Sequence, residues 1–428
     1  MSSKKRNLIL GCIADDVTGA TDLAINLVQG GMRVVQLLAI PTKLELSELD
    51  ADAVVVGLKT RSIPKREAKE QSVQCLRVFR QSGIERYFFK YCSTFDSTSE
   101  GNIGPVAAAL METIDMEQTV FCPALPRNGR TVYQGHLFVN GKLLNESGME
   151  NHPLNPMTDA NLVRVLSQQC DRNVGLLSFE DIEAGIVADR LEELRSEGTP
   201  FVIVDACSDE QLVVIAGSAA DLPLVTGGSG IARFLPAAYR KNGLLTSAEY
   251  VVARPRVTGR SLIVAGSCSL ATNRQVEWMK DKIPCWPVDV DEVVTNKEIA
   301  LAKVQDWARS ADVNSPLLIA TTATAERVAE IQSQHGGKAV AAAIEDFLSE
   351  VTSSFVSDFA LARLIIAGGE TSGAILQSLG VRALRIDAEI CAGVPWTESI
   401  GERPMALALK SGNFGSDDFF ERALEMLP

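Results

Sequence analysis

Residues 8–20 read LILGCIADDVTGA, and they predict the first strand–helix unit of the fold. Seven mostly apolar residues run up to the adjacent aspartates Asp15 and Asp16, and a helical pattern follows as far as Gly30-Gly31. A short apolar run that ends at polar turn residues is typical of a buried strand. In parallel α/β sheets, ligands bind where the carboxyl end of a strand leads into a helix. The two aspartates therefore occupy a candidate ligand-binding position.

The same alternation of strands and helices continues along the chain. In the first half, strands are predicted at residues 8–14, 33–39, 53–58, 87–91, 119–123, 174–179 and 201–205. In the second half, they are predicted at residues 261–265, 317–321, 364–367, 382–387 and 405–409. This order is typical of largely parallel sheets flanked by helices, so the fold class is α/β. Residues 133–144 predict a hairpin instead, because Asn140-Gly141 suits a type I′ turn.

The pattern changes near residues 247–258, where one proline and two arginines interrupt it without a helical period. A chain of 428 residues is long enough for two or three domains. We therefore expect two α/β domains, residues 1–248 and 257–428, on either side of this linker.

Composition narrows the class of protein. The chain carries 41 Lys and Arg against 54 Asp and Glu, a formal charge of −13, which argues against a nucleic-acid partner. No apolar run approaches the ~20 residues that span a bilayer, so no membrane partner is expected. Nine scattered cysteines without a C-x-x-C pair favour a reduced, cytoplasmic protein. Three histidines without H-E-x-x-H spacing favour no metal held by imidazoles. The oligomeric state, including a homo-oligomer, stays open.

Charged residues follow three strands of the first half. Asp15 and Asp16 could divide their roles, one as general base on a hydroxyl and the other as helix cap, or both could simply cap the helix. Lys90 precedes a Ser/Thr-rich loop that could bind a carboxylate, although such a loop is also common as a capping structure. Arg127 and Arg130 could bind a carboxylate bidentately, and a solvated loop is the stronger interpretation for Arg127.

Glycine-rich turns follow three strands of the second half, at residues 265–269, 367–374 and 410–415. Backbone N–H groups of such turns can approach phosphate oxygens closely at a helix N-terminus. Each turn alone could be glycine-rich for steric reasons, and together they favour a phosphate-binding role. The sequence contains neither the P-loop nor the G-x-G-x-x-G motif, so a bound nucleotide would be held in another way.

Several motifs together identify a resemblance that covers nearly the whole chain. They are Asp15-Asp16-x-Thr18-Gly19-Ala20, Thr60-Arg61-Ser62-x-Pro64, Asp96-Ser97-Thr98, Gly227-Gly228-Ser229-Gly230 and Gly368-Gly369-Glu370-Thr371-Ser372-Gly373. In this order they resemble the four-carbon acid sugar kinase family, whose members have a sugar-acid domain followed by a nucleotide domain. Glu100 departs from the family, in which an arginine is usual. With the motifs at residues 128–135 and 152–159, this variant looks like the 3-oxo-tetronate kinase branch.

The resemblance implies ATP-dependent phosphorylation, with Mg²⁺, of the terminal hydroxyl of a 3-oxo four-carbon sugar acid. It implies nucleotide contacts at Ser267, at the turn Gly369-Glu370-Thr371-Ser372 and at Gly412, with the active site in the cleft between the domains. We hypothesise that Asp16, or less favourably Asp15, acts on the hydroxyl. The remaining sugar-acid contacts would come from Lys90, Arg61 and Arg130 for the carboxylate and from Asp96 and Ser97 for hydroxyls. Glu370 could reach Mg²⁺ through water.

Three alternatives stay open. A kinase of plain erythronate or threonate would share the same machinery. A sugar-acid dehydrogenase should carry a glycine-rich dinucleotide turn where this chain has Asp15 and Asp16. A non-catalytic sugar-acid binding protein would have no use for the three nucleotide-type turns.

Overall fold

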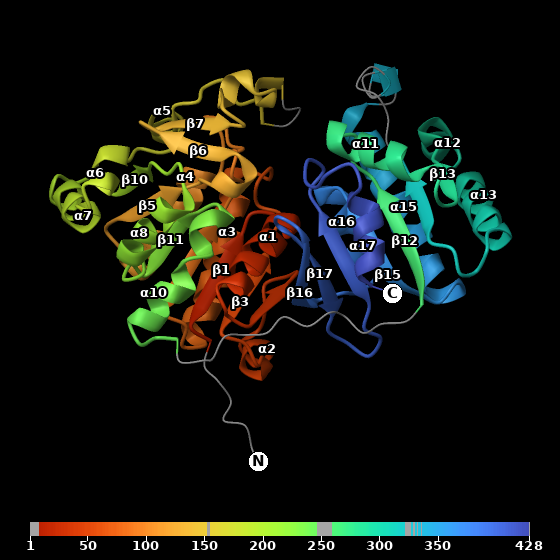
Figure 1. Cartoon of the computed structure of the whole chain (residues 1–428), viewed down its shortest axis with the longest axis horizontal. Coiled ribbons are helices and arrows are strands. Elements are labelled where there is room, and N and C mark those ends of the chain that lie inside the picture. Colours follow the sequence, from red (N-terminus) through yellow and green to blue (C-terminus); the bar gives the residue numbers. More distant parts are fainter. Residues whose placement is uncertain are drawn as a thin grey trace, which may run out of the picture. The chain divides into compact units, whose positions relative to one another are not determined.

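The computed structural model describes residues 8–151, 155–245, 259–321, 327, 330–331, 333–334 and 336–427. The chain divides into two compact units, Met1–Val251 and Val252–Pro428 (Figure 1). The predicted linker from residue 247 to 258 and the start of the predicted motif at residues 152–159 lie outside the described residues.

The first unit is built on eight parallel strands in the order β2-β3-β1-β4-β11-β5-β10-β9. Ala14, the last residue of β1, pairs with Gly57 of β3 and with Lys90 of β4. The carboxyl ends of these three strands therefore meet at one edge of the sheet. The strands are β1 (Leu10–Ala14), β2 (Val34–Leu37), β3 (Ala53–Gly57), β4 (Arg86–Lys90), β5 (Thr119–Cys122), β9 (Val174–Leu177), β10 (Phe201–Val204) and β11 (Leu224–Gly227).

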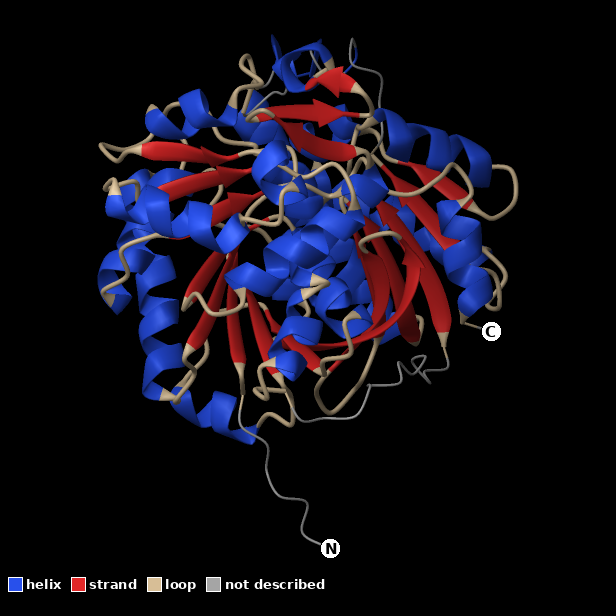
Figure 2. Ribbon diagram, turned by 60° about the vertical axis from the view of Figure 1, so that its left-hand side comes forward, coloured by secondary structure: helices blue, strands red, loops and turns tan. Residues whose placement is uncertain are grey.

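Helices cover the strands of this unit, as Figure 2 shows with helices in blue and strands in red. The central strands are buried along their whole length, which explains their continuous apolar sequence. The helices are α1 (Val17–Gln29), α2 (Lys43–Glu48), α3 (Lys65–Gln81), α4 (Ile103–Ile114), α5 (Leu162–Ser167), α6 (Phe179–Glu183), α7 (Val187–Ser196), α8 (Asp209–Ala219), α9 (Ser229–Ala232) and α10 (Leu235–Lys241).

A small antiparallel sheet accompanies the large one. It consists of β6 (Arg130–Tyr133), β7 (His136–Val139) and β8 (Lys142–Leu143), preceded by the 3₁₀ turn η1 (Pro126–Asn128). Asn140 and Gly141 connect β7 to β8 with φ of 51° and 78°, as the predicted type I′ turn requires. The predicted hairpin is confirmed. The 3₁₀ turns η2 (Leu144–Glu146) and η3 (Met149–Asn151) follow.

The second unit has seven strands in the order β13-β14-β12-β15-β18-β17-β16. The first five are parallel, whereas β16, β17 and β18 form an antiparallel meander. Trp396 of β17 belongs to the buried core. The strands are β12 (Arg260–Ala265), β13 (Cys285–Pro287), β14 (Leu317–Ala320), β15 (Leu361–Ala367), β16 (Ala383–Cys391), β17 (Val394–Ser399) and β18 (Ala406–Lys410).

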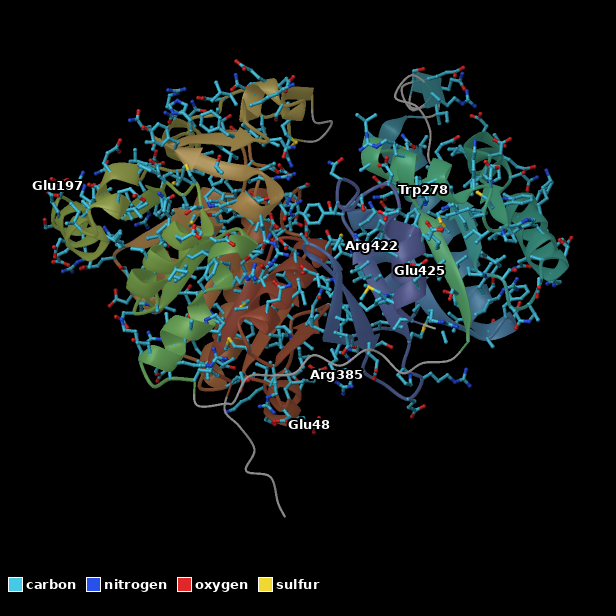
Figure 3. All side chains as sticks on the ribbon, viewed as in Figure 1. Glu48, Glu197, Trp278, Arg385, Arg422 and Glu425 are labelled. Atoms are coloured by element: carbon cyan, nitrogen blue, oxygen red, sulfur yellow. The ribbon has the colours of Figure 1, made fainter. Side chains whose placement is uncertain are left out.

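Helices also flank this second sheet (Figure 2). The α11 and α17 helices pack together, and Trp278 of α11 donates to Glu421 of α17 at 2.9 Å; Figure 3 labels Trp278 and the neighbouring Arg422. The helices include α11 (Leu270–Met279), α12 (Val290–Thr295), α13 (Lys297–Ser310), α15 (Gly337–Asp358), α16 (Gly369–Ser378) and α17 (Phe419–Met426). No helix in the described part of the chain is long and apolar enough to cross a membrane.

Candidate active site

Two carboxylates stand at the end of β1 in the first unit. Asp16 is the N-cap of α1, and its side chain accepts hydrogen bonds from the Gly19 N–H and, at 3.4 Å, from the Thr18 hydroxyl. Asp15 is directed to Arg61 instead. The two neighbours therefore differ in role, and Asp16 is the more accessible, with 24% of its side chain exposed against 7% for Asp15.

Arg61 connects these carboxylates. Its Nε donates to Asp15 Oδ2 at 2.9 Å and its Nη2 to Asp15 Oδ1 at 2.8 Å, while Nη2 also pairs with Asp16. The remaining nitrogen, Nη1, lies 3.9 Å from Asp96 Oδ2. The Asn102 amide holds the loop that carries Arg61, because it donates to the carbonyls of Thr60 at 2.8 Å and of Ile63 at 2.9 Å.

The environment separates the pKa values of the two aspartates. Burial raises the pKa of Asp15, although the paired Arg61 opposes this. Burial also disfavours the charge on Asp16, but Arg61, Lys90 and the hydrogen bond from Gly19 outweigh it, so the pKa of Asp16 is lowered. Asp16 is therefore the more readily ionised of the two carboxylates, and it is also the more accessible.

Lys90 lies beneath this pair as the last residue of β4. Its side chain is almost fully buried, and its Nζ donates to the Tyr91 carbonyl at 2.8 Å and lies 3.9 Å from Asp22 Oδ2. The Lys90 charge is thus shared between a backbone carbonyl and two carboxylates, Asp22 and Asp16.

The loop after β4 brings Asp96 and Ser97 to the same place. Asp96 accepts from the Thr94 hydroxyl at 2.6 Å, and the Ser97 hydroxyl accepts from the Gln169 amide at 2.8 Å. The side-chain oxygen of Gln169, Oε1, in turn accepts a hydrogen bond from the Gly104 N–H at 2.8 Å. Gln169 therefore connects this loop to the start of α4. Among the residues lining one small cavity are Asp15, Thr60, Arg61, Asp96, Ser97 and Asn102.

Two other charged positions make no hydrogen bond or ion pair with this cluster within the described residues. Arg130 opens β6 and donates to the Asn128 carbonyl within its own turn, with its Nε buried and without a hydrogen-bond partner among the described residues. Glu100, the departure from the family pattern, is 89% exposed and lies 3.9 Å from Lys65 on the surface. Glu100 is therefore directed to Lys65 and to solvent rather than to Arg61.

In the second unit, the three predicted turns lie side by side. They follow β12, β15 and β18, which are adjacent parallel strands, with Ala367 paired to Ala265 on one side and to Lys410 on the other. The Ser267 N–H donates to the Ala367 carbonyl at 3.0 Å, and the Gly368 N–H donates to the Lys410 carbonyl at 2.9 Å.

The turns approach so closely that a Cβ on either of two glycines would meet a neighbouring side chain. A Cβ on Gly412 would lie 2.3 Å from Ser267 Oγ, and one on Gly266 would lie 2.2 Å from Thr371 Oγ1. Ser267, Thr371 and Gly412 are therefore brought together. Gly369 and Glu370 are exposed at the start of α16, whereas the Ser372 hydroxyl is buried and donates to the Gly368 carbonyl at 2.7 Å.

Sequence reasoning missed several residues that build these sites. The side-chain amides of Asn102 and Gln169 hold loops that are distant from these residues in the sequence. No local pattern indicates such residues. Lys410 lies in the predicted turn at residues 410–415, but the role of its side chain was not predicted, although it ends β18 as Lys90 ends β4.

Comparison with known proteins then identifies the family. Residues 10–235 match the model of a sugar-binding N-terminal domain, and residues 262–420 match that of a nucleotide-binding C-terminal domain. A protein named 3-oxo-tetronate kinase from Pseudomonas savastanoi pv. phaseolicola is 47% identical over 430 residues, covering 100% of this chain and 99% of the relative. The chain belongs to the four-carbon acid sugar kinase family, in its 3-oxo-tetronate kinase branch.

Other members agree with this assignment. A 3-oxo-tetronate kinase from Pseudomonas fluorescens is 48% identical, covering 98% of this chain and 97% of the relative. A solved structure from Salmonella typhimurium LT2, provisionally described as a tRNA synthase, superposes with a TM-score of 0.85 at 41% identity over 98% of this chain and 99% of that one. One from Haemophilus influenzae gives 0.76 at 38% identity over 98% and 100%. The predicted resemblance and α/β fold class are confirmed.

Proposed function

We propose that this family member is an ATP-dependent kinase that phosphorylates the 4-hydroxyl of a 3-oxo-tetronate, a four-carbon sugar acid. The identity of 47–48% over essentially full length to proteins named 3-oxo-tetronate kinase carries this proposal. The first domain, predicted at residues 1–248, binds the sugar acid, and the second, predicted at residues 257–428, binds ATP.

Asp16 orients the attacking hydroxyl and accepts its proton as the hydroxyl oxygen bonds to the γ-phosphorus of ATP and the bond to the bridging oxygen breaks, releasing ADP. Its lowered pKa keeps it ionised, and its partial exposure leaves an oxygen accessible to a substrate hydroxyl. Phosphoryl transfer needs positioning and charge neutralisation more than a strong base, so a carboxylate of low pKa is sufficient. Asp15 and Arg61 fix the position of Asp16 from below.

The sugar-acid carboxylate is bound by Arg61, Lys90 and Arg130. Arg61 uses Nη1 for this purpose, since Nε and Nη2 are occupied by Asp15 and Asp16. Asp96 and Ser97 contact the substrate hydroxyls, because both lie beside Arg61 at the small cavity. Ser97 can donate, as its oxygen already accepts from Gln169.

The nucleotide is bound by Ser267, by the turn Gly369-Glu370-Thr371-Ser372 and by Gly412. The close approach of these turns, which a Cβ at Gly412 would prevent, leaves backbone groups and hydroxyls available to phosphate oxygens. Mg²⁺ would neutralise the charge of those phosphates, and Glu370, which is exposed, would contact it through water. The reaction belongs to the cytoplasm, where the nine free cysteines would stay reduced.

A thermal-shift measurement tests the kinase assignment without the sugar acid. ATP with Mg²⁺ at millimolar concentration is expected to raise the melting temperature, whereas NAD is not, because ligands stabilise the state that binds them. A response to NAD and none to ATP would overturn the kinase assignment.

A further inference from the structure

Lys410 is a buried charged residue at the nucleotide turns to which nothing above gives a role. It is the last residue of β18 and is 0% exposed. Its Nζ donates to three acceptors, Thr272 Oγ1 at 3.1 Å, the Ser411 carbonyl at 3.1 Å and the Gly412 carbonyl at 2.9 Å. Three acceptors use all three N–H groups of an ammonium, so the site is built for the charged side chain.

The Gly412 carbonyl is the centre of this arrangement. Besides Lys410, it accepts from the Ser269 hydroxyl at 2.6 Å and from the Thr272 hydroxyl at 2.9 Å. Three donors thus fix one carbonyl of the turn that packs against Ser267. The backbone carbonyl of Lys410 also accepts from the Gly368 N–H at 2.9 Å. Lys410 therefore contacts the turns after β15 and β18 directly and the α11 terminus through Thr272.

Lys410 and Lys90 differ in the groups that surround their ammonium groups. Lys90 has Asp22 at 3.9 Å, whereas within the described residues no carboxylate lies at ion-pair distance from Lys410. The groups around its ammonium are Thr272 from α11, the Phe419 ring from α17 at 5.9 Å and Cys391 from β16, and its neighbour on β15 is Ala367. A buried cation without a carboxylate is costly unless an anion binds nearby.

We propose that Lys410 is a positioning residue for nucleotide binding, which fixes the Ser411-Gly412 turn against Ser267 and supplies a buried positive charge to the phosphates of ATP. This inference rests on the proposed function. Lys410 would shape the ATP site without being one of the residues that contact the nucleotide. The negative charge that balances its ammonium would come from the phosphates of ATP.

Because Lys410 is buried, its proposed role in ATP binding depends on pH. It lowers the pKa of Lys410 to about 7, with Cys391 opposing the shift. A bound phosphate favours the ammonium, so ATP binding is accompanied by proton uptake near neutrality. ATP affinity should therefore fall as the pH rises through about 7, because more of the free enzyme is then neutral at Lys410.

The variants Lys410→Met and Lys410→Gln test the inference through ATP affinity, measured by calorimetry and as KM. Lys410→Met should raise the KM for ATP on the order of 10–100-fold, because the turn loses both charge and hydrogen bonds. Lys410→Gln keeps donors and should be intermediate, with a flat pH profile of ATP affinity. The KM for the sugar acid should change by less than about twofold in both. The control is Lys280→Met, an equal charge change at an exposed lysine of the same unit, paired with Glu277.

The outcomes separate the two claims. A wild-type protein that does not bind ATP overturns the proposed function itself. A wild type that binds ATP, with both Lys410 variants binding equally well and with the same pH profile, overturns only the role of Lys410. If Lys410→Met does not fold, Thr272→Val removes one acceptor and one donor to Gly412 at nearly constant volume, and an unchanged ATP KM in that variant and in Lys410→Gln would equally overturn the role.

Discussion

Arg61 binds Asp15 through two parallel hydrogen bonds, from Nε to Oδ2 at 2.9 Å and from Nη2 to Oδ1 at 2.8 Å. This bidentate geometry is the strongest that arginine forms with a carboxylate. It commits Asp15 to Arg61 and leaves Asp16, the more accessible carboxylate, for the substrate. The roles of the two adjacent aspartates therefore follow from how one arginine is shared between them.

Replacing Asp16 with asparagine should reduce kcat on the order of 10²–10⁴-fold, the usual contribution of a general base. Asparagine caps helices as well as aspartate does, so α1 should keep its N-cap and the melting temperature should change little. Steady-state kinetics with a melting curve checks both parts. Near-normal turnover of Asp16→Asn would show that Asp16 is not the base.

Replacing Arg61 with lysine should lower kcat/KM for the sugar acid by about 10–100-fold and the free energy of unfolding by about 1–3 kcal/mol. Lysine keeps the charge but loses the two parallel hydrogen bonds to the buried Asp15. Arg66→Lys is the matched control, because Arg66 is 86% exposed and pairs with Glu70 on the surface of α3. Equal behaviour of the two variants in urea unfolding would contradict the structural role of Arg61.

Replacing Gly412 with alanine should raise the KM for ATP by at least about tenfold. The new Cβ would lie 2.3 Å from Ser267 Oγ, so the Ser267 side chain or one of the two turns must move. Gly401→Ala, in the same unit with open space around its Cβ, should leave the KM unchanged. ATP titrations of both variants measure this KM. An unchanged KM for ATP in Gly412→Ala would show that this turn is not part of the nucleotide site.

Asp387 of β16 predicts a pH dependence of stability. Burial, with Glu398 adding to it, raises the pKa of Asp387 from 3.8 to about 7, and its Oδ2 has no hydrogen-bond partner among the described residues. Between these two values the folded state binds more protons than the unfolded state, so the contribution of Asp387 falls as pH rises and is most unfavourable above about 7.

Asp387→Asn should therefore raise the melting temperature at about pH 8 and have little effect near pH 4, where the wild-type carboxyl is also neutral. Melting curves at both values provide the check. A variant that is equally destabilised at both would mean that the carboxylate has an ionised partner in the folded state.

Local patterns predicted the strand–helix order, because apolar runs between turn residues are read within a few positions. They missed β17, where Pro395 and the polar run Thr397-Glu398-Ser399 obscure a strand that the buried Trp396 anchors. The end of the first strand indicated Asp15, and the family resemblance added Arg61 and roles for Asp96 and Ser97, but neither predicted which of these residues pair. Arg61 meets Asp15 across 46 residues, and Gln169 meets Ser97 across 72, and such pairs are set by sheet order rather than by local spacing.

The central claim is that this chain phosphorylates a 3-oxo-tetronate with ATP. A coupled assay of ADP release over erythronate, threonate and their 3-oxo forms, with Mg²⁺, tests it most directly. We expect the highest kcat/KM for a 3-oxo acid, with the rate of ADP release reduced on the order of 10²–10⁴-fold in Asp16→Asn. A higher kcat/KM for plain erythronate or threonate, or no ADP release with any of these acids, would contradict it.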